Sequence, residues 1–100
     1  MDEYHVRLTT RALQDLDDIY AYIAQTLLEP QTARALIDDL ETQILSLSHL
    51  PFRCPRRTVG AYAAKGYRQL LVKNYTVIYR IDDSQKQVIV LTVRYARSAF

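Results

Sequence analysis

The sequence predicts an α+β protein in the order β-α-α-β-β-β, with a mainly antiparallel sheet packed against a helical hairpin. Two long amphipathic segments follow one another between residues 10 and 48. Three β-rich runs joined by short polar turns then occupy residues 67–93. Helices separated in sequence from a meander of strands are typical of a two-layer α+β sandwich.

Length and composition indicate a single domain over residues 1–100. No apolar run reaches the roughly 18 residues that a membrane span needs. The first residues are acidic, whereas a signal peptide begins with basic ones. The single cysteine, Cys54, has no partner for an internal disulfide. These features predict a cytoplasmic protein that does not enter a membrane.

The first half is expected to hold one short strand and one helix before the chain turns. Apolar and polar side chains alternate over residues 4–8, which predicts a strand. Thr9 and Thr10 can then cap a helix, because a side-chain hydroxyl accepts from the free amides of the first turn. The predicted apolar stripe of this helix is Leu13, Leu16, Ile19, Tyr20, Ile23 and Leu27. The acidic group Asp15, Asp17 and Asp18 is expected on its solvated face, because carboxylates at this spacing do not converge on a metal.

A second helix is predicted over residues 31–48. Pro30 suits its first turn, where the missing N–H has no helical partner anyway. Its apolar stripe is Ala33, Leu36, Ile37, Leu40, Ile44, Leu47 and Leu50. Pro51 ends it, and residues 51–66 form a long irregular stretch of a kind that is often functional.

The last third is predicted to be three strands, at residues 67–72, 75–81 and 88–93. The link Lys73-Asn74 is short, and Asn74 tolerates the positive φ that tight hairpins demand. Tyr75 and Tyr79 share a face with other apolar residues and are expected to pack. The last run is continuously apolar, which indicates a strand that is covered on both faces or that sits centrally in the sheet.

Charge is divided unevenly between the halves. Residues 1–50 hold three basic and nine acidic residues, whereas residues 51–100 hold ten basic and two acidic ones. Such asymmetry favours an anionic or acidic partner for the second half. The alternative is that the halves attract each other and form an ordinary solvated surface.

Several kinds of catalytic site are not indicated by the sequence. There is no Gly-rich phosphate loop and no Cys/His metal spacing, so neither cofactor nor metal is expected. His5 and His49 have no motif around them, and Cys54 has no paired base. RNA cleavage by a 2′-OH needs a base, positive charge and an acid, which an arginine-tyrosine cluster can supply. The candidate catalytic residues are Arg68, Tyr95 and Arg97; the candidate nucleic-acid or target-binding residues are Lys65, Lys73, Arg80, Arg94, Arg56 and Arg57.

The ordered set of motifs resembles the RelE/ParE superfamily of toxins, often described as plasmid stabilisation modules. Tyr67-Arg68 with Leu70 and Val72 is followed by Tyr75, Val77 and Tyr79-Arg80, and then by the run Val-Ile-Val-Leu-Thr-Val-Arg-Tyr-Ala-Arg at residues 88–97. The first half agrees through Leu16, Ile19-Tyr20 and Tyr22-Ile23, then Glu29-Pro30 and Ala33, and finally Leu50-Pro51.

This resemblance implies a cytoplasmic toxin of a type II toxin–antitoxin system, held inactive in a hetero-oligomer by a cognate antitoxin. It also implies growth inhibition, either by ribosome-dependent mRNA cleavage as an mRNA interferase or by poisoning DNA gyrase. Thr76, Ala96 and Phe100 stand where nucleases of the superfamily carry Arg, His and Tyr. Whether the chain is an enzyme is therefore open, and a non-catalytic interaction module, such as a degenerate toxin, is the alternative.

Overall fold

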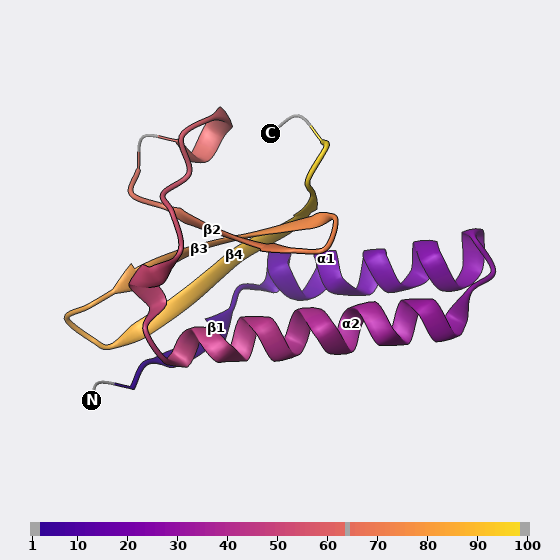
Figure 1. The fold of residues 1–100 in the computed structure, drawn as a ribbon, viewed down its shortest axis with the longest axis horizontal. Coiled ribbons are helices and arrows are strands. Elements are labelled where there is room, and N and C mark those ends of the chain that lie inside the picture. Colours follow the sequence, from indigo (N-terminus) through magenta and orange to yellow (C-terminus); the bar gives the residue numbers. More distant parts are fainter. Residues whose placement is uncertain (1–2, 64, 99–100) are drawn as a thin grey trace.

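A four-stranded sheet and a helical hairpin make up the structure, which is a computed structural model and describes residues 3–63 and 65–98. The elements are β1 (His5–Leu8), α1 (Thr10–Ala21), α2 (Pro30–Leu45), β2 (Arg68–Val72), β3 (Tyr75–Asp82) and β4 (Gln87–Tyr95). The two helices lie against one face of the sheet, and their joined ends extend beyond it (Figure 1). The predicted α+β class and element order are confirmed.

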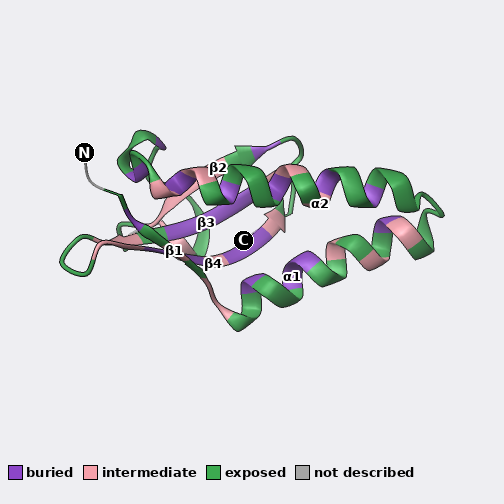
Figure 2. Cartoon of the chain, turned by 90° about the horizontal axis from the view of Figure 1, so that it is seen from below, coloured by how far each residue is buried: buried purple, intermediate pink, exposed green. Residues whose placement is uncertain are grey.

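Strand pairing places the apolar run of β4 at the centre of the sheet. The strand order is β1-β4-β3-β2, with β1 parallel to β4 and the other two pairs antiparallel. Val88 and Val90 of β4 are fully buried, as the continuous apolar run predicts. The purple strands behind the helices in Figure 2 show this buried layer. The mainly antiparallel sheet is thus as predicted.

The buried stripe of α1 is rotated from the predicted one. Thr9 fixes the start of the helix on β4, since its N–H donates to the Val90 carbonyl oxygen at 3.0 Å and its hydroxyl to that of Leu91 at 2.8 Å. This orientation brings the small side chain of Ala12, which is fully buried, against the strand. Leu13 consequently faces solvent, with 53% of its surface exposed. The prediction that it belongs to the core is wrong.

A π-helical turn, Tyr22–Thr26, continues α1 toward the hairpin tip. Its wider turn is closed by the Leu27 N–H, which donates to the Tyr22 carbonyl oxygen at 3.0 Å. Leu27, at the end of this turn, is accordingly 49% exposed, and Tyr20, within α1, is 37% exposed. The prediction that both belong to the core is wrong. Such single π-turns are frequent at functional sites.

The second helix follows its predicted stripe until its last turn. Ala33 and Leu40 are fully buried, and Pro30 occupies the first turn as expected. A 3₁₀ turn, Ser46–Ser48, then ends the helical segment. Leu50 lies beyond it in left-handed backbone and is 67% exposed, so its assignment to the stripe is wrong.

Two details of the sheet differ from the sequence pattern. In the β2–β3 turn, the residue with positive φ is Lys73 (54°), whereas Asn74 was expected to take that role. A register shift opposite Ile78 and Tyr79 inserts Leu91 into β4 as a bulge. Tyr79 is fully buried, as predicted from its position on the core face.

Candidate functional site

A groove of about 900 Å³ lies between the helical hairpin and the ends of β3 and β4. We call it the hairpin groove. Its apolar lining comprises Ile19, Tyr22, Ile23, Leu27, Ala35, Leu36, Tyr75, Val93 and Tyr95. Tyr22 and Leu27 come from the π-turn and its end, and both are about half exposed, at 55% and 49%. Large apolar side chains left open in a groove are typical of a surface that a partner covers.

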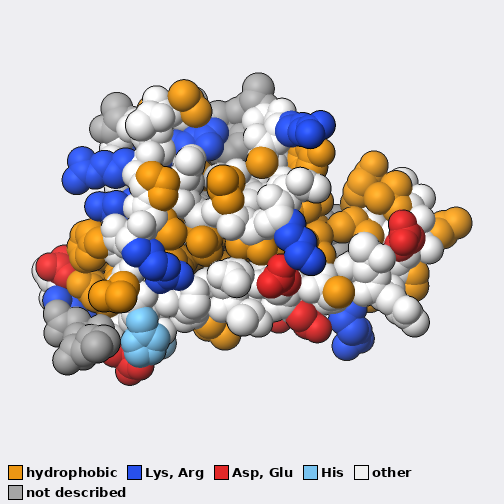
Figure 3. All heavy atoms as spheres, viewed as in Figure 1, with side chains coloured by type: hydrophobic (Ala, Val, Ile, Leu, Met, Phe, Trp, Pro, Cys, Tyr) orange, Lys and Arg blue, Asp and Glu red, His pale blue; other side chains and the backbone are white. Residues whose placement is uncertain are grey.

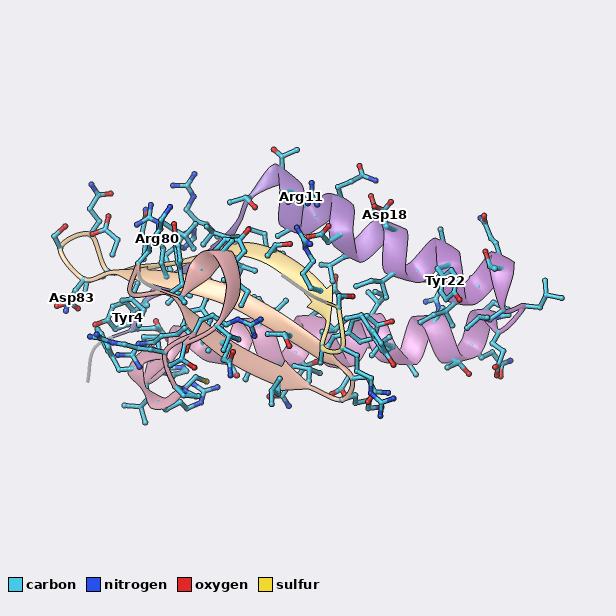
Figure 4. All side chains as sticks on the ribbon, turned by 90° about the horizontal axis from the view of Figure 1, so that it is seen from above. Tyr4, Arg11, Asp18, Tyr22, Arg80 and Asp83 are labelled. Carbon is cyan, nitrogen blue, oxygen red and sulfur yellow. The ribbon has the colours of Figure 1, made fainter. Side chains whose placement is uncertain are left out.

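The polar lining of the hairpin groove is divided by charge. Asp15, Asp18 and Glu29 come from the hairpin, whereas Lys73 and Arg94 come from the sheet. Figure 4 shows Asp18 on α1 and Tyr22 farther along the same hairpin arm. A partner in this groove therefore meets carboxylates on one wall and cations on the other.

Asp15 of α1 joins the helical hairpin to β4 at one side of the groove. Its carboxylate accepts from the Thr92 hydroxyl and, at 3.1 Å, from the Val93 N–H. Arg11 pairs with it at 3.2 Å. Arg94 Nε in turn donates to the Thr92 hydroxyl oxygen at 3.1 Å. Asp15 is only 9% exposed, so its predicted place on the solvated face is wrong.

The sequence contains a signal that marks Asp15 as buried. It lies three residues after Ala12 and four before Ile19, at helical spacings that share one face. The predicted stripe leaves out Ala12, and so the neighbouring carboxylate falls outside it. Asp17 and Asp18 are exposed, as expected.

Arg68 serves the architecture of the loop before β2. Its guanidinium donates to the Cys54 carbonyl oxygen at 2.6 Å and lies 5.2 Å from the centre of the Phe52 ring. In the sheet it pairs with Tyr79, on the face toward the helices. These contacts hold residues 52–54 against β2 and engage one terminal nitrogen, Nη1, of the guanidinium.

The other two candidate catalytic residues lie elsewhere. Tyr95 pairs with Tyr75, and their rings meet edge to face at 5.7 Å. Because Arg68 pairs with Tyr79, four residues of β3, or about 13 Å, separate it from Tyr95 along the strand. Arg97 is exposed in the turn after β4, where the Ala96 N–H donates to the Asn74 carbonyl oxygen at 2.7 Å. Phe100 lies outside the described residues.

The candidate binding residues are also dispersed. Lys73 pairs with Asp39 of α2 at 3.7 Å and lines the hairpin groove, as does Arg94. Arg57 donates to the Gln69 side chain at 2.9 Å. Arg80 is exposed and alternates with the core residue Tyr79, so it belongs to the opposite face of the sheet (Figure 4).

The remaining two candidate binding residues lie in and beyond the loop that precedes β2. Arg56 forms an isolated antiparallel bridge with Arg68, and its side chain is exposed. Lys65 is also exposed. The geometry thus assembles no single arginine-tyrosine centre from the predicted set.

Two of the core-face tyrosines are held in their neutral form. Burial, together with neighbouring Cys54, raises the pKa of Tyr79 far above its ordinary value, and its hydroxyl donates to the Pro51 carbonyl oxygen at 2.6 Å. Burial also raises the pKa of Tyr75, with smaller contributions from Tyr95 and Tyr22. A neutral phenol with a raised pKa is a poor general base near neutral pH.

The far end of the molecule carries a further polar contact, seen in Figure 4. Tyr4 donates its hydroxyl to Asp83, and this bond raises the pKa of Tyr4 and lowers the pKa of Asp83. It joins the segment before β1 to the β3–β4 turn. Within residues 3–63 and 65–98, no cluster of His, Cys, Asp or Glu could hold a metal ion. No helix in the described parts of the chain is long and apolar enough to cross a bilayer.

Solved structures with the same fold are toxins of toxin–antitoxin systems. The chromosomal ParDE system of P. aeruginosa superposes with a TM-score of 0.79 at 20% identity, covering 97% of this chain and 100% of that one. The RelBE2 complex of Mycobacterium tuberculosis gives 0.64 at 29% identity, covering 95% and 93%. The archaeal RelE–RelB complex of Pyrococcus horikoshii OT3 gives 0.61 at 16% identity, covering 99% and 100%.

Sequence comparison agrees with the fold. No curated protein matches the chain. The sequence model described as "ParE toxin of type II toxin-antitoxin system, parDE" matches residues 6–100. The resemblance to the RelE/ParE superfamily is therefore confirmed, and the chain belongs to the ParE toxin family of type II toxin–antitoxin systems.

Proposed function

We propose that this toxin inhibits growth by binding a protein target and that a cognate antitoxin neutralises it through the hairpin groove. The observation that carries the first part is the separation of Arg68 from Tyr95. Arg68 donates through Nη1 to the Cys54 carbonyl oxygen, and Tyr95 lies about 13 Å farther along the sheet. General acid–base chemistry needs its groups within hydrogen-bond reach of one substrate. DNA gyrase, the target that the superfamily resemblance implies for non-nuclease members, is the protein we propose.

The groove supports the second part of the proposal. A helix carrying apolar side chains at i, i+4 and i+7 fits an apolar channel between two elements. Its basic side chains would face Asp18 and Glu29, and its acidic ones would face Lys73 and Arg94. The M. tuberculosis structure that shares this fold is likewise a toxin–antitoxin complex. The occupied groove would cover Tyr22 and Leu27, which otherwise expose apolar surface to water.

Ribosome-dependent mRNA cleavage is the second candidate. The observation that favours it is Arg80, which is exposed on the sheet face opposite the helices. Arginine recognises phosphate oxygens through its planar guanidinium, and one such face could hold an RNA strand. This candidate requires Arg80 to work with a base that lies on the same face.

Thermal unfolding tests the antitoxin proposal. The product of the adjacent small gene is mixed with the purified chain, and Tm is measured against the chain alone. A ligand that binds only the native state at about 100 times its Kd adds about 2.7 kcal/mol of stability. An unchanged Tm contradicts the proposal. Expression without the antitoxin separates a toxin from a non-catalytic interaction module, because only a toxin arrests growth.

A further inference from the structure

Leu50 holds a backbone conformation that leucine rarely adopts. Its φ is 51° and its ψ is 54°, in the left-handed region, and it directly precedes Pro51. Gly and Asn are the residues that usually occupy this region. Its side chain is nevertheless 67% exposed, so burial does not explain the choice of leucine. A local conflict between sequence and conformation is expected where function requires it.

Hydrogen bonds from three side chains hold this strained turn. The Tyr79 hydroxyl donates to the Pro51 carbonyl oxygen at 2.6 Å from inside the core. Arg53 donates to the carbonyl oxygens of His49 at 2.7 Å and Leu50 at 3.3 Å. Arg68 fixes the next residues through the Cys54 carbonyl oxygen. Strained backbone persists where its surroundings determine it in this way, and such strain concentrates at binding sites.

The turn presents two apolar side chains surrounded by cations. Phe52, 51% exposed, lies beside Leu50 in the chain and carries the Arg68 guanidinium 5.2 Å from its ring centre. Arg53 and Arg56 are exposed on either side of Cys54. We call Leu50, Phe52, Arg53, Arg56 and Arg68 the Leu50 patch. In Figure 3, hydrophobic and basic side chains are intermixed on the left-hand half of the molecule.

The chain segment that supplies the Leu50 patch contains no acidic residue. No Asp or Glu occurs between Glu41 and Asp82. Among the described ion pairs, none joins a carboxylate to Arg53, Arg56 or Arg68. The nearby carboxylates are already engaged, Glu3 with His49 and Asp83 with Tyr4 and Lys86. Arg53 and Arg68 donate to backbone carbonyl oxygens, but no described ion pair neutralises their charge or that of Arg56, so the Leu50 patch keeps a net positive charge toward a partner.

We infer that the Leu50 patch binds an acidic protein segment with apolar side chains, carried by the toxin's target. The charge of the patch selects acidic partners, and the exposed Leu50 selects protein over nucleic acid. A leucine side chain offers nothing to a phosphate, and the ring of Phe52 is already engaged by Arg68 and, edge to face, by Tyr4. This inference rests on the proposal that the toxin acts by binding a protein. The hairpin groove, whose lining includes none of these residues, is a separate surface.

Leu50→Asn is the variant that tests the inference. Asn tolerates left-handed backbone, so the variant is expected to unfold at or above the wild-type Tm. Leu28→Asn is the matched control, because Leu28 is also left-handed (φ 58°) and exposed (79%), at the opposite end of α2. Phe52→Ser is a second patch variant that leaves the backbone of the turn unaltered.

The probe is a synthetic amphipathic helical peptide of alternating Glu and Leu turns, titrated into ¹⁵N-labelled protein and followed by amide chemical shifts. Wild type and Leu28→Asn are expected to show salt-sensitive shifts centred on residues 50–57. Leu50→Asn and Phe52→Ser are expected to bind at least about tenfold more weakly. Shifts confined to the hairpin groove, or equal affinity in all four proteins, would overturn the inference. Stronger shifts at residues 50–57 with a single-stranded RNA 20-mer than with the peptide would overturn it in favour of nucleic acid.

Induction in growing cells without antitoxin separates this inference from the proposed function. Growth arrest by wild type and Leu28→Asn, but not by Leu50→Asn, supports both. Arrest by all three overturns the role of the patch and leaves the toxin assignment intact. Unaffected growth with wild type, together with the expected peptide shifts, overturns the proposed function and leaves the patch as a binding surface.

Discussion

The carboxylate of Asp15 accepts the backbone N–H of Val93 at 3.1 Å, beyond the point where β1 stops pairing with β4. In the first half of β4, the backbone pairs with β1. In the second half, the Asp15 carboxylate accepts the backbone N–H of Val93 instead. A carboxylate on α1 thus accepts a backbone N–H on the edge of β4 that β1 leaves unpaired, and this contact fixes the helical hairpin on the sheet. The hairpin groove depends on this contact, because its walls are the two elements that Asp15 joins.

Replacing Asp15 with Ala is expected to lower the free energy of unfolding by about 2–3 kcal/mol, because it leaves the Thr92 hydroxyl and Val93 N–H buried without their acceptor. Urea denaturation measures the loss. Asp17→Ala is the control, since Asp17 is exposed on the same helix and should stay within about 0.5 kcal/mol of wild type. Equal effects of the two substitutions would show that Asp15 is not a structural acceptor.

Tyr79→Phe is expected to destabilise the protein by about 1–2 kcal/mol, since it leaves the Pro51 carbonyl oxygen without its buried donor. The reference variant is Tyr20→Phe, at a position on α1 that is 37% exposed. Chemical denaturation of both variants gives the comparison. No loss in Tyr79→Phe would contradict the account of how the Leu50 turn is held.

Stability should also fall at high pH because of Tyr79. Its pKa is raised in the folded state, so the unfolded chain ionises first as pH rises through about 10. Its contribution is therefore complete below pH 10 and is lost progressively above it. Denaturation midpoints measured between pH 7 and 11 should decline less steeply above pH 10 in Tyr79→Phe than in wild type. Parallel declines would assign the effect to other groups.

Leu27→Asp is expected to weaken antitoxin binding about 100-fold, because it places a charge in the apolar lining of the hairpin groove. Titration calorimetry with the purified antitoxin measures the change. Leu13→Asp serves as the matched control, since Leu13 is exposed to a similar extent but lies outside the groove lining. If both variants bind like wild type, the antitoxin occupies another surface.

Substitution of Arg68 and of Arg97 by Ala is expected to have different effects on stability. Arg68→Ala should cost about 1–3 kcal/mol of stability, because it removes the guanidinium that binds the Cys54 carbonyl oxygen and covers Phe52. Arg97→Ala should leave stability within about 0.5 kcal/mol, since Arg97 is exposed after β4. Thermal melts decide between them. Undiminished stability in Arg68→Ala would show that these contacts do not stabilise the loop.

Much of the fold can be predicted from local patterns. Alternation, the helical stripe of α2 and the continuous apolar run of β4 each reflect burial on one or two faces. The rotation of α1 is not visible in its hydrophobic residues alone, because Thr9 sets it by bonding to β4, more than 80 residues away in the chain. The parallel pairing of β1 with β4 and the bulge at Leu91 are likewise long-range choices.

The candidate site is less accessible from sequence than the fold. A run of arginines and tyrosines shows which side chains exist but not which carbonyl oxygens they meet. Arg68 is the clearest case, because its partners belong to a loop without periodicity. The hairpin groove is assembled from α1, the π-turn, α2, the β2–β3 turn, the start of β3 and the end of β4. From the sequence, the apolar residues of this groove cannot be distinguished from core residues. The structure shows that Tyr22 and Leu27, in and after the π-turn, are exposed.

The most direct test of the central claim is to induce the toxin without antitoxin and examine transcripts and gyrase in the same cells. Mapping of mRNA 5′ ends reports cleavage, and recovery of DNA covalently bound to gyrase reports poisoning. The account predicts arrested growth, intact transcripts and accumulated gyrase–DNA complexes. New mRNA ends within translated regions, with gyrase complexes at their uninduced level, would contradict it.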